Sequence, residues 1–111
     1  MQFLLLLYGD EAAEAALSAE ERRAIVERHR AFSKRLRDEG RMLGGDALEP
    51  SSTAATVRRG RATDGPFIET KEQLGGYYLT ECADRAEAIE VARGVPESPG
   101  MVVEVRPLAG M

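Results

Sequence analysis

Residues 3–8 (FLLLLY) constrain the fold of this chain more than any other segment. Successive side chains of a strand point to opposite faces, and here both sets are apolar or aromatic. This pattern is typical of an interior strand that is covered on both faces. The segment is too short to cross a membrane, which takes about 20 apolar residues. It also lacks a basic flank and a cleavage site, so we expect no export signal and a cytoplasmic protein.

A long helix is predicted at residues 19–39. Ser18 and Glu21 have the spacing of a capping box, and Gly40 supplies a stop. A stripe at helical spacing runs between them and consists of Ile25, Val26, His29, Phe32, Ser33 and Leu36. The single histidine of the chain therefore lies on the face that we expect to pack on a sheet.

The remaining segments predict strands around a second helix. Residues 42–48 are expected to pair with residues 54–58 as a hairpin, and a turn at residues 59–61 leads to a shaped loop, DGPF, at residues 64–67. Residues 76–80 and 101–106 read as further strands. Between them, Asp84 and Glu87 predict the cap of a helix that carries Ala88, Ile89 and Ala92.

This order of elements is close to the split βαβ arrangement of α+β proteins, in which the helices cover one face of an antiparallel sheet. Two helices cannot cover both faces, yet residues 3–8 are apolar on both. We therefore expect the open face to pack on a second copy around a two-fold axis. At 111 residues the chain fits a single domain, residues 1–111, that hides only about two-thirds of its surface on folding.

Charge and residue counts exclude several classes of protein. The net charge of −4 argues against nucleic acid or an anionic membrane as the main partner. One cysteine and one histidine cannot form a zinc site within one chain, so no metal is expected. The glycine pairs at residues 44–45 and 75–76 lack the spacing and the following helix of a phosphate loop, so no nucleotide cofactor is expected.

Residues 64–78 (DGPFIETKEQLGGYY) resemble the signature of the DGPF proteins, a branch of the YCII-related family. The likeness extends to residues 39–45 and 103–107 and so covers nearly the whole chain. It implies a ferredoxin-like α+β fold that pairs as a dimeric α/β barrel. Some relatives in the YCII group are enzymes acting on ring compounds, and DGPF proteins often resemble companions of extracytoplasmic-function sigma factors.

In the wider YCII group, a histidine on the first helix pairs with an aspartate just after the second helix as a catalytic dyad. His29 matches the histidine. The aspartate position falls near residues 94–96 (GVP), where no carboxylate stands, so this chain departs from the pattern.

Two residues are the catalytic candidates. His29 is suited to general acid–base work near neutral pH, and the alternative is a core histidine bonded to a backbone carbonyl. Asp64 would orient His29 if the DGPF loop folds over the pocket, whereas an aspartate before Gly-Pro is commonly a turn residue.

The candidate ligand-binding side chains are polar or aromatic. Lys71 would meet an anionic ligand that Glu69 and Thr70 hydrogen-bond, and the alternative is a solvated loop. Alternation sends Tyr77 and Tyr78 to opposite faces of the sheet. The predicted ligand-binding set is Tyr8, Phe67, Glu69, Thr70, Lys71 and Tyr78. Cys82 lies near Glu81 and Asp84, which favour a neutral thiol, so it is not expected to be a nucleophile.

Two functions follow. The first is a cofactor-free acid–base enzyme of lyase or hydrolase type that acts on a small anionic or cyclic molecule. The second is a non-catalytic ligand-sensing or accessory module that partners a sigma factor or another regulator. Arg58, Arg59 and Arg61 form a basic cluster that such a partner would use.

Overall fold

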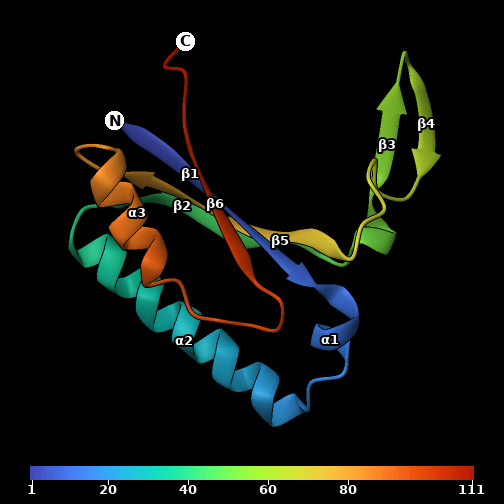
Figure 1. Cartoon of the computed structure of the whole chain (residues 1–111), viewed down its shortest axis with the longest axis horizontal. Helices are drawn as coiled ribbons and strands as arrows, with labels where there is room; N and C mark the ends of the chain where they lie inside the picture. The colour runs from blue at the N-terminus through green and yellow to red at the C-terminus, as the bar shows by residue number, and fades with distance from the viewer.

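Four antiparallel strands form the main sheet in the computed structural model, which describes residues 1–111. They lie in the order β2, β5, β1, β6 (Figure 1). Their bounds are Gln2–Asp10 for β1, Met42–Ala47 for β2, Glu72–Glu81 for β5 and Val102–Pro107 for β6. The strand with the FLLLLY sequence, β1, thus has a neighbour on each side, as predicted.

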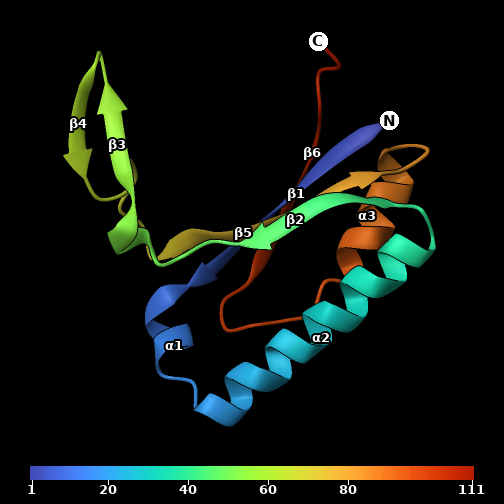
Figure 2. The ribbon, with the colours of Figure 1, turned by 180° about the vertical axis from the view of Figure 1, so that it is seen from behind.

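Helices α2 (Ala19–Asp38) and α3 (Arg85–Arg93) cover the same face of this sheet (Figures 1 and 2). The predicted capping box at the start of α2 is present: Ser18 Oγ accepts from the Glu21 N–H, and the Glu21 carboxylate accepts from the Ser18 N–H. Asp84 caps α3 by accepting from the Glu87 N–H. The α+β architecture agrees with the ferredoxin-like expectation. None of the helices combines the length and the apolarity that a membrane crossing requires.

The core lies between the helices and the sheet. Phe3 and Leu5 of β1 are fully buried against Phe32 and Leu36 of α2. No helix covers the other face of the sheet (Figure 1). Alternation along β1 sends the intervening side chains, among them Leu6, to that face, and they are only partly buried. The two apolar sides of β1 therefore have different surroundings in a single chain.

The prediction that residues 42–48 pair with residues 54–58 as a hairpin is wrong. β2 pairs with β5, whereas β3 (Ala55–Arg58) pairs with β4 (Arg61–Asp64) in a separate two-stranded sheet. Only Arg59 and Gly60 connect β3 to β4, with φ angles of 50° and 78°. Positive φ at both positions gives the two-residue turn that matches the twist of a hairpin, so the local pairing is favoured.

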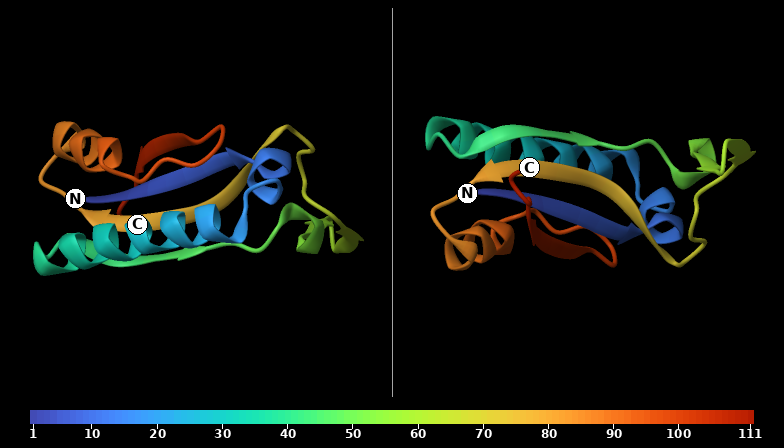
Figure 3. Two further views of the ribbon diagram at one scale, coloured as in Figure 1. Left: turned by 90° about the horizontal axis from the view of Figure 1, so that it is seen from below. Right: turned by 90° about the horizontal axis from the view of Figure 1, so that it is seen from above.

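Two short helical segments were not predicted, η1 (Ser51–Thr53) and α1 (Glu11–Ala15). Asp10 caps α1 by accepting from the Ala13 N–H at 3.1 Å. Figure 3 shows α1 at the end of the sheet where the β3–β4 hairpin also begins. Since α1 follows β1 directly, it brings Glu14 beside the first turns of α2.

Candidate functional site

A cavity of about 580 Å³ lies between the sheet and the first turns of α2. This volume is in the range of pockets that take small molecules. Phe32 and Leu36 of α2 pack on the sheet, whereas the side of the helix that carries Ile25, His29 and Ser33 lines the cavity. The apolar part of the lining includes Leu7, Leu17, Ile25, Val26, Met42, Leu48 and Met101.

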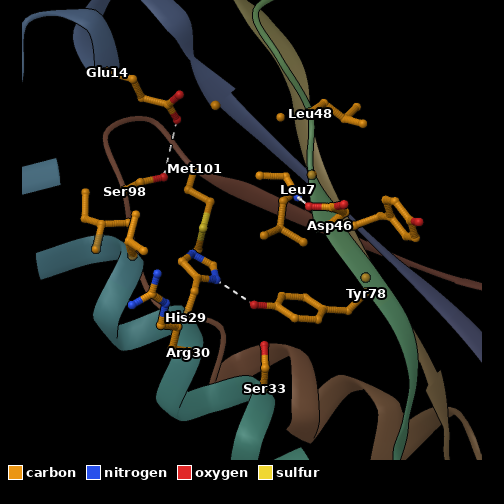
Figure 4. Close-up of a pocket in the computed structure, with 18 of the residues that line it drawn as sticks. Leu7, Glu14, His29, Arg30, Ser33, Asp46, Leu48, Tyr78, Ser98 and Met101 are labelled. Atoms are coloured by element: carbon orange, nitrogen blue, oxygen red, sulfur yellow. Dashed lines mark hydrogen bonds between the residues drawn. The ribbon is translucent and has the colours of Figure 1, made fainter. Parts of the chain in front are cut away.

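His29 lies in this cavity and is bonded to Tyr78 of β5 (Figure 4). The distance from His29 Nδ1 to Tyr78 Oη is 2.6 Å, and the two rings stack with their centroids 6.0 Å apart. Phe32 packs edge-on against the Tyr78 ring. Gly45 of β2 leaves room for that ring, because a Cβ there would come within 3.0 Å of Tyr78 Cδ1. The imidazole is therefore held in one orientation by an aromatic cluster.

Burial shifts the pKa values of both partners. It lowers the pKa of His29, and the positive charge of Arg28 lowers it further. It raises the pKa of Tyr78, although Ser33 and Arg37 act in the opposite direction. Either atom can be the donor in the bond between His29 Nδ1 and Tyr78 Oη, because the roles depend on the tautomer of the imidazole. Nε2 makes no hydrogen bond within the chain, so it is free to contact a ligand.

Glu14 of α1 is a second titratable group of the cavity, which the sequence did not single out. Ser98 Oγ donates to its carboxylate at 3.4 Å. Burial raises the pKa of Glu14, and the charges of Glu11 and Asp10 add to this. No cationic side chain pairs with the carboxylate. Gly9 makes room for it, because a Cβ at Gly9 would overlap Glu14 Oε1. Figure 4 shows Glu14 and Tyr78 at opposite ends of the cavity with His29 between them.

Three arginines of α2 also line the cavity, but they differ in their partners. Arg22 donates to the main-chain oxygens of Glu14 and Leu17, at 3.5 and 3.4 Å. Arg30 forms an ion pair with Glu27. Arg37 has no carboxylate partner, and its one side-chain hydrogen bond is to the sulfur of Met42, at 4.0 Å. Arg37 therefore has a guanidinium available for an anionic ligand at the Tyr78 end.

The predicted site residues fall into two groups. His29 and Tyr78 line the cavity. Tyr8 also borders it, but its hydroxyl donates at 3.4 Å to Glu104, which lies on the open face of the sheet. The structure does not bring Asp64 to His29, because Asp64 ends β4 in the hairpin and is exposed. Tyr78 occupies the partner position that was expected for Asp64.

The DGPF loop and the residues after it also lie outside the cavity of His29. Phe67 is 69% exposed. Glu69 and Thr70 line a separate polar hollow, together with Glu11 and Ser51, and Lys71 forms an ion pair with Asp10 at 3.6 Å. The hairpin carries this loop away from the helices, which is why the loop does not fold over the cavity.

Metal ligands are not grouped in the structure: no three His, Cys, Asp or Glu side chains lie together in a way that could hold an ion. Cys82 is buried and free. The polar chemistry of the cavity is thus that of an imidazole, a phenol, a carboxylate and guanidinium groups.

Comparison with known proteins identified a family and a relative. The family model described as the YCII-related domain matches residues 1–110. An uncharacterized protein of Rhizobium meliloti (strain 1021) is 36% identical over 115 residues, covering 98% of this chain and 93% of the relative.

Proposed function

The chain belongs to the YCII-related family, and on this premise we propose that it binds a small anionic or cyclic molecule in the cavity of His29 and transfers a proton to or from it. The observation that carries the proposal is the 2.6 Å contact between His29 Nδ1 and Tyr78 Oη at the wall of a cavity of molecular size. A histidine fixed in this way, with its second nitrogen unbonded, has the geometry of an acid–base group.

Glu14 supplies the second proton site in this proposal. Two groups whose pKa values are shifted by their surroundings, on different walls of one cavity, are suited to an acid and a base acting on one ligand. His29 donates a hydrogen bond from Nε2–H to an oxygen of the ligand, and the Glu14 carboxyl group, whose pKa is raised, exchanges a proton with the ligand. Arg37 neutralises an anionic group of the ligand, and the apolar lining holds a ring or a short carbon chain.

The test is an NMR titration of the ¹⁵N-labelled protein with benzoate, phenol and a panel of further small organic acids and phenols. We expect the amide signals of cavity residues such as Leu7, Ile25 and Met101 to move with at least one ligand class. His29→Ala should weaken that binding about tenfold or more. Arg93→Ala on the far helix is the control. If no cavity signal moves with any probe, or if His29→Ala binds as well as the wild type, the proposal is wrong.

The alternative function is a non-catalytic ligand-sensing or accessory module that partners a sigma factor or another regulator. It is favoured by the lack of a carboxylate partner for His29 and by the exposed basic residues of the hairpin. His29→Ala separates the two functions. An enzyme loses turnover in this variant, whereas an accessory module keeps its affinity for the regulator.

We also propose that the protein is a cytoplasmic homodimer that pairs through the open face of the sheet. Leu4, Leu6 and Leu79 lie on this face and remain partly exposed in the single chain. Apolar side chains side by side on neighbouring strands are the composition expected of a subunit interface.

A further inference from the structure

The β3–β4 hairpin, which we call the arginine arm (residues 55–64), carries charge that the chain does not balance. The arm has three arginines and one aspartate, so its net charge is +2, whereas the rest of the chain is then −6. Arg58, Arg59 and Arg61 are exposed, and none of them forms an ion pair within the chain. Arg58 lies 5.3 Å over the ring of Phe67, which leaves its charge unneutralised.

Three features reduce the stability of the arm in an isolated chain. Arg58 and Arg61 are directly opposite each other in the hairpin, where like charges repel. Arg59 has a φ of 50°, a conformation in which glycine or asparagine is usual. The arm is also a two-stranded sheet of its own, which is marginally stable without further packing. An anionic surface against the arginines would offset the repulsion.

The position of the arm indicates which surface this is. Figures 1 and 2 show the arm rising from the sheet on the side opposite to α2 and α3, which is the side of the open face. The strand registers place Asp46, Glu81 and Glu104 on that open face beside Leu6 and Leu79. Glu81 pairs with the N-terminal ammonium group and Glu104 with Arg106, so Asp46 is the unpaired carboxylate of the three. The Asp46 carboxylate accepts from the Ala47 N–H and has no cationic partner.

We propose that the arginine arm clasps a second copy of this chain, with Arg58 and Arg61 against the carboxylates of its open sheet face. The inference rests on the proposed homodimer and adds to it a basic clamp at the rim of the interface. Rim charges of this kind set the register of two subunits and make their association sensitive to salt.

The experiment compares dimer dissociation constants by sedimentation equilibrium for the wild type, R58E/R61E and R23E/R85E. R58E/R61E reverses the charge of the arm. It keeps a like-charge pair across the hairpin, so the arm of the variant should be about as stable as the wild-type arm. R23E/R85E makes the same change in net charge on exposed positions of α2 and α3. Circular dichroism establishes that each variant is folded.

We expect R58E/R61E to raise the dissociation constant at least about tenfold, and R23E/R85E to leave it within about threefold of the wild type. A wild-type dimer that both variants leave equally intact would overturn the role of the arm but not the dimer. A wild type that is still monomeric at a protein concentration of about 100 μM would overturn both the homodimer and the role of the arm, because its dimer would be too weak to matter. Binding of poly-L-glutamate by the wild type alone, with an unchanged dimer, would overturn the clamp in favour of another acidic protein.

Discussion

His29 and Glu14 are the two residues on which the chemistry of the cavity depends. Burial lowers the pKa of one and raises the pKa of the other, so both shifts favour the uncharged form. Neither side chain has an oppositely charged partner to cancel this effect. A group in that state exchanges protons with a ligand at lower cost than a group locked in an ion pair.

Tyr78→Phe tests which partner of the His29–Tyr78 bond is the donor. A phenol that donates to Nδ1 stabilises the neutral imidazole, so its removal should raise the pKa of His29. The measurement is an NMR pH titration of the single imidazole in both proteins. A fall in the His29 pKa would show that the imidazole donates to Tyr78 and would contradict the assignment of the proton to Nε2.

Glu14→Gln should stabilise the protein at neutral pH. Because the folded pKa of Glu14 lies above its unfolded value, the folded state binds more protons, and stability falls as pH rises from the unfolded pKa through the folded one. The glutamine removes that cost. The carboxylate is partly in contact with water, so the gain at pH 7 should be below about 1 kcal/mol.

Urea unfolding at pH 7 and pH 3 measures this difference. The two proteins should be equally stable at pH 3, where Glu14 is protonated, and Glu69→Gln on the exposed loop is the control. A Glu14→Gln variant that is less stable than the wild type at pH 7 would mean that the carboxylate has a stabilising partner in solution.

At the scale of secondary structure, α2 determines where His29 stands. The helix begins at the Ser18 capping box, and its buried residues Phe32 and Leu36 fix its far end on the sheet. The first turns depend more on the cap than on packing, because they line the cavity. Removing the Ser18 cap should therefore loosen the part of α2 that carries His29.

Ser18→Ala should lower the free energy of unfolding by about 1 kcal/mol, since it removes the hydroxyl that accepts from the Glu21 N–H. Urea unfolding measures the loss, and Ser52→Ala, outside any helix cap, is the comparison. We also expect faster hydrogen exchange in the first turn of α2. Equal stability of the two variants would contradict the importance of the cap.

Local signals explain which elements could be predicted from the sequence. In β1 the apolar residues are continuous, and Ser18 and Asp84 cap the helices that follow them. Each of these signals spans only a few residues, so β1, α2 and α3 could be predicted. The pairing of β2 with β5 joins segments about 30 residues apart, and sequence proximity favoured β3 instead. Helix α1 has five residues, too few to show a period.

The site was predicted only in part for the same reason. The histidine stood out because it is unique and lies on an apolar stripe, but its bond to Tyr78 joins positions 49 residues apart. Glu14 was missed because its short helix was missed; the signal available was the Asp10 cap. The DGPF loop was expected near His29, but the arm that carries it extends away from the helices (Figures 1 and 2).

At the scale of the whole molecule, the two faces of β1 give a matched test of the dimer. Leu5 is fully buried under the helices, whereas Leu6 lies on the open face. Leu5→Glu should unfold the chain, because it buries an unpaired charge. Leu6→Glu should leave the chain folded but monomeric, as measured by circular dichroism and light scattering. A folded Leu6→Glu dimer would exclude the open face as the interface.

The central claim is that His29 belongs to a ligand-binding cavity, and the most direct measurement is an NMR pH titration of its imidazole with and without the panel of small organic acids and phenols. We predict a pKa below the usual value of about 6.5 in the free protein, and a second shift when one ligand class binds. An imidazole that titrates near 6.5 and responds to no ligand would contradict the claim.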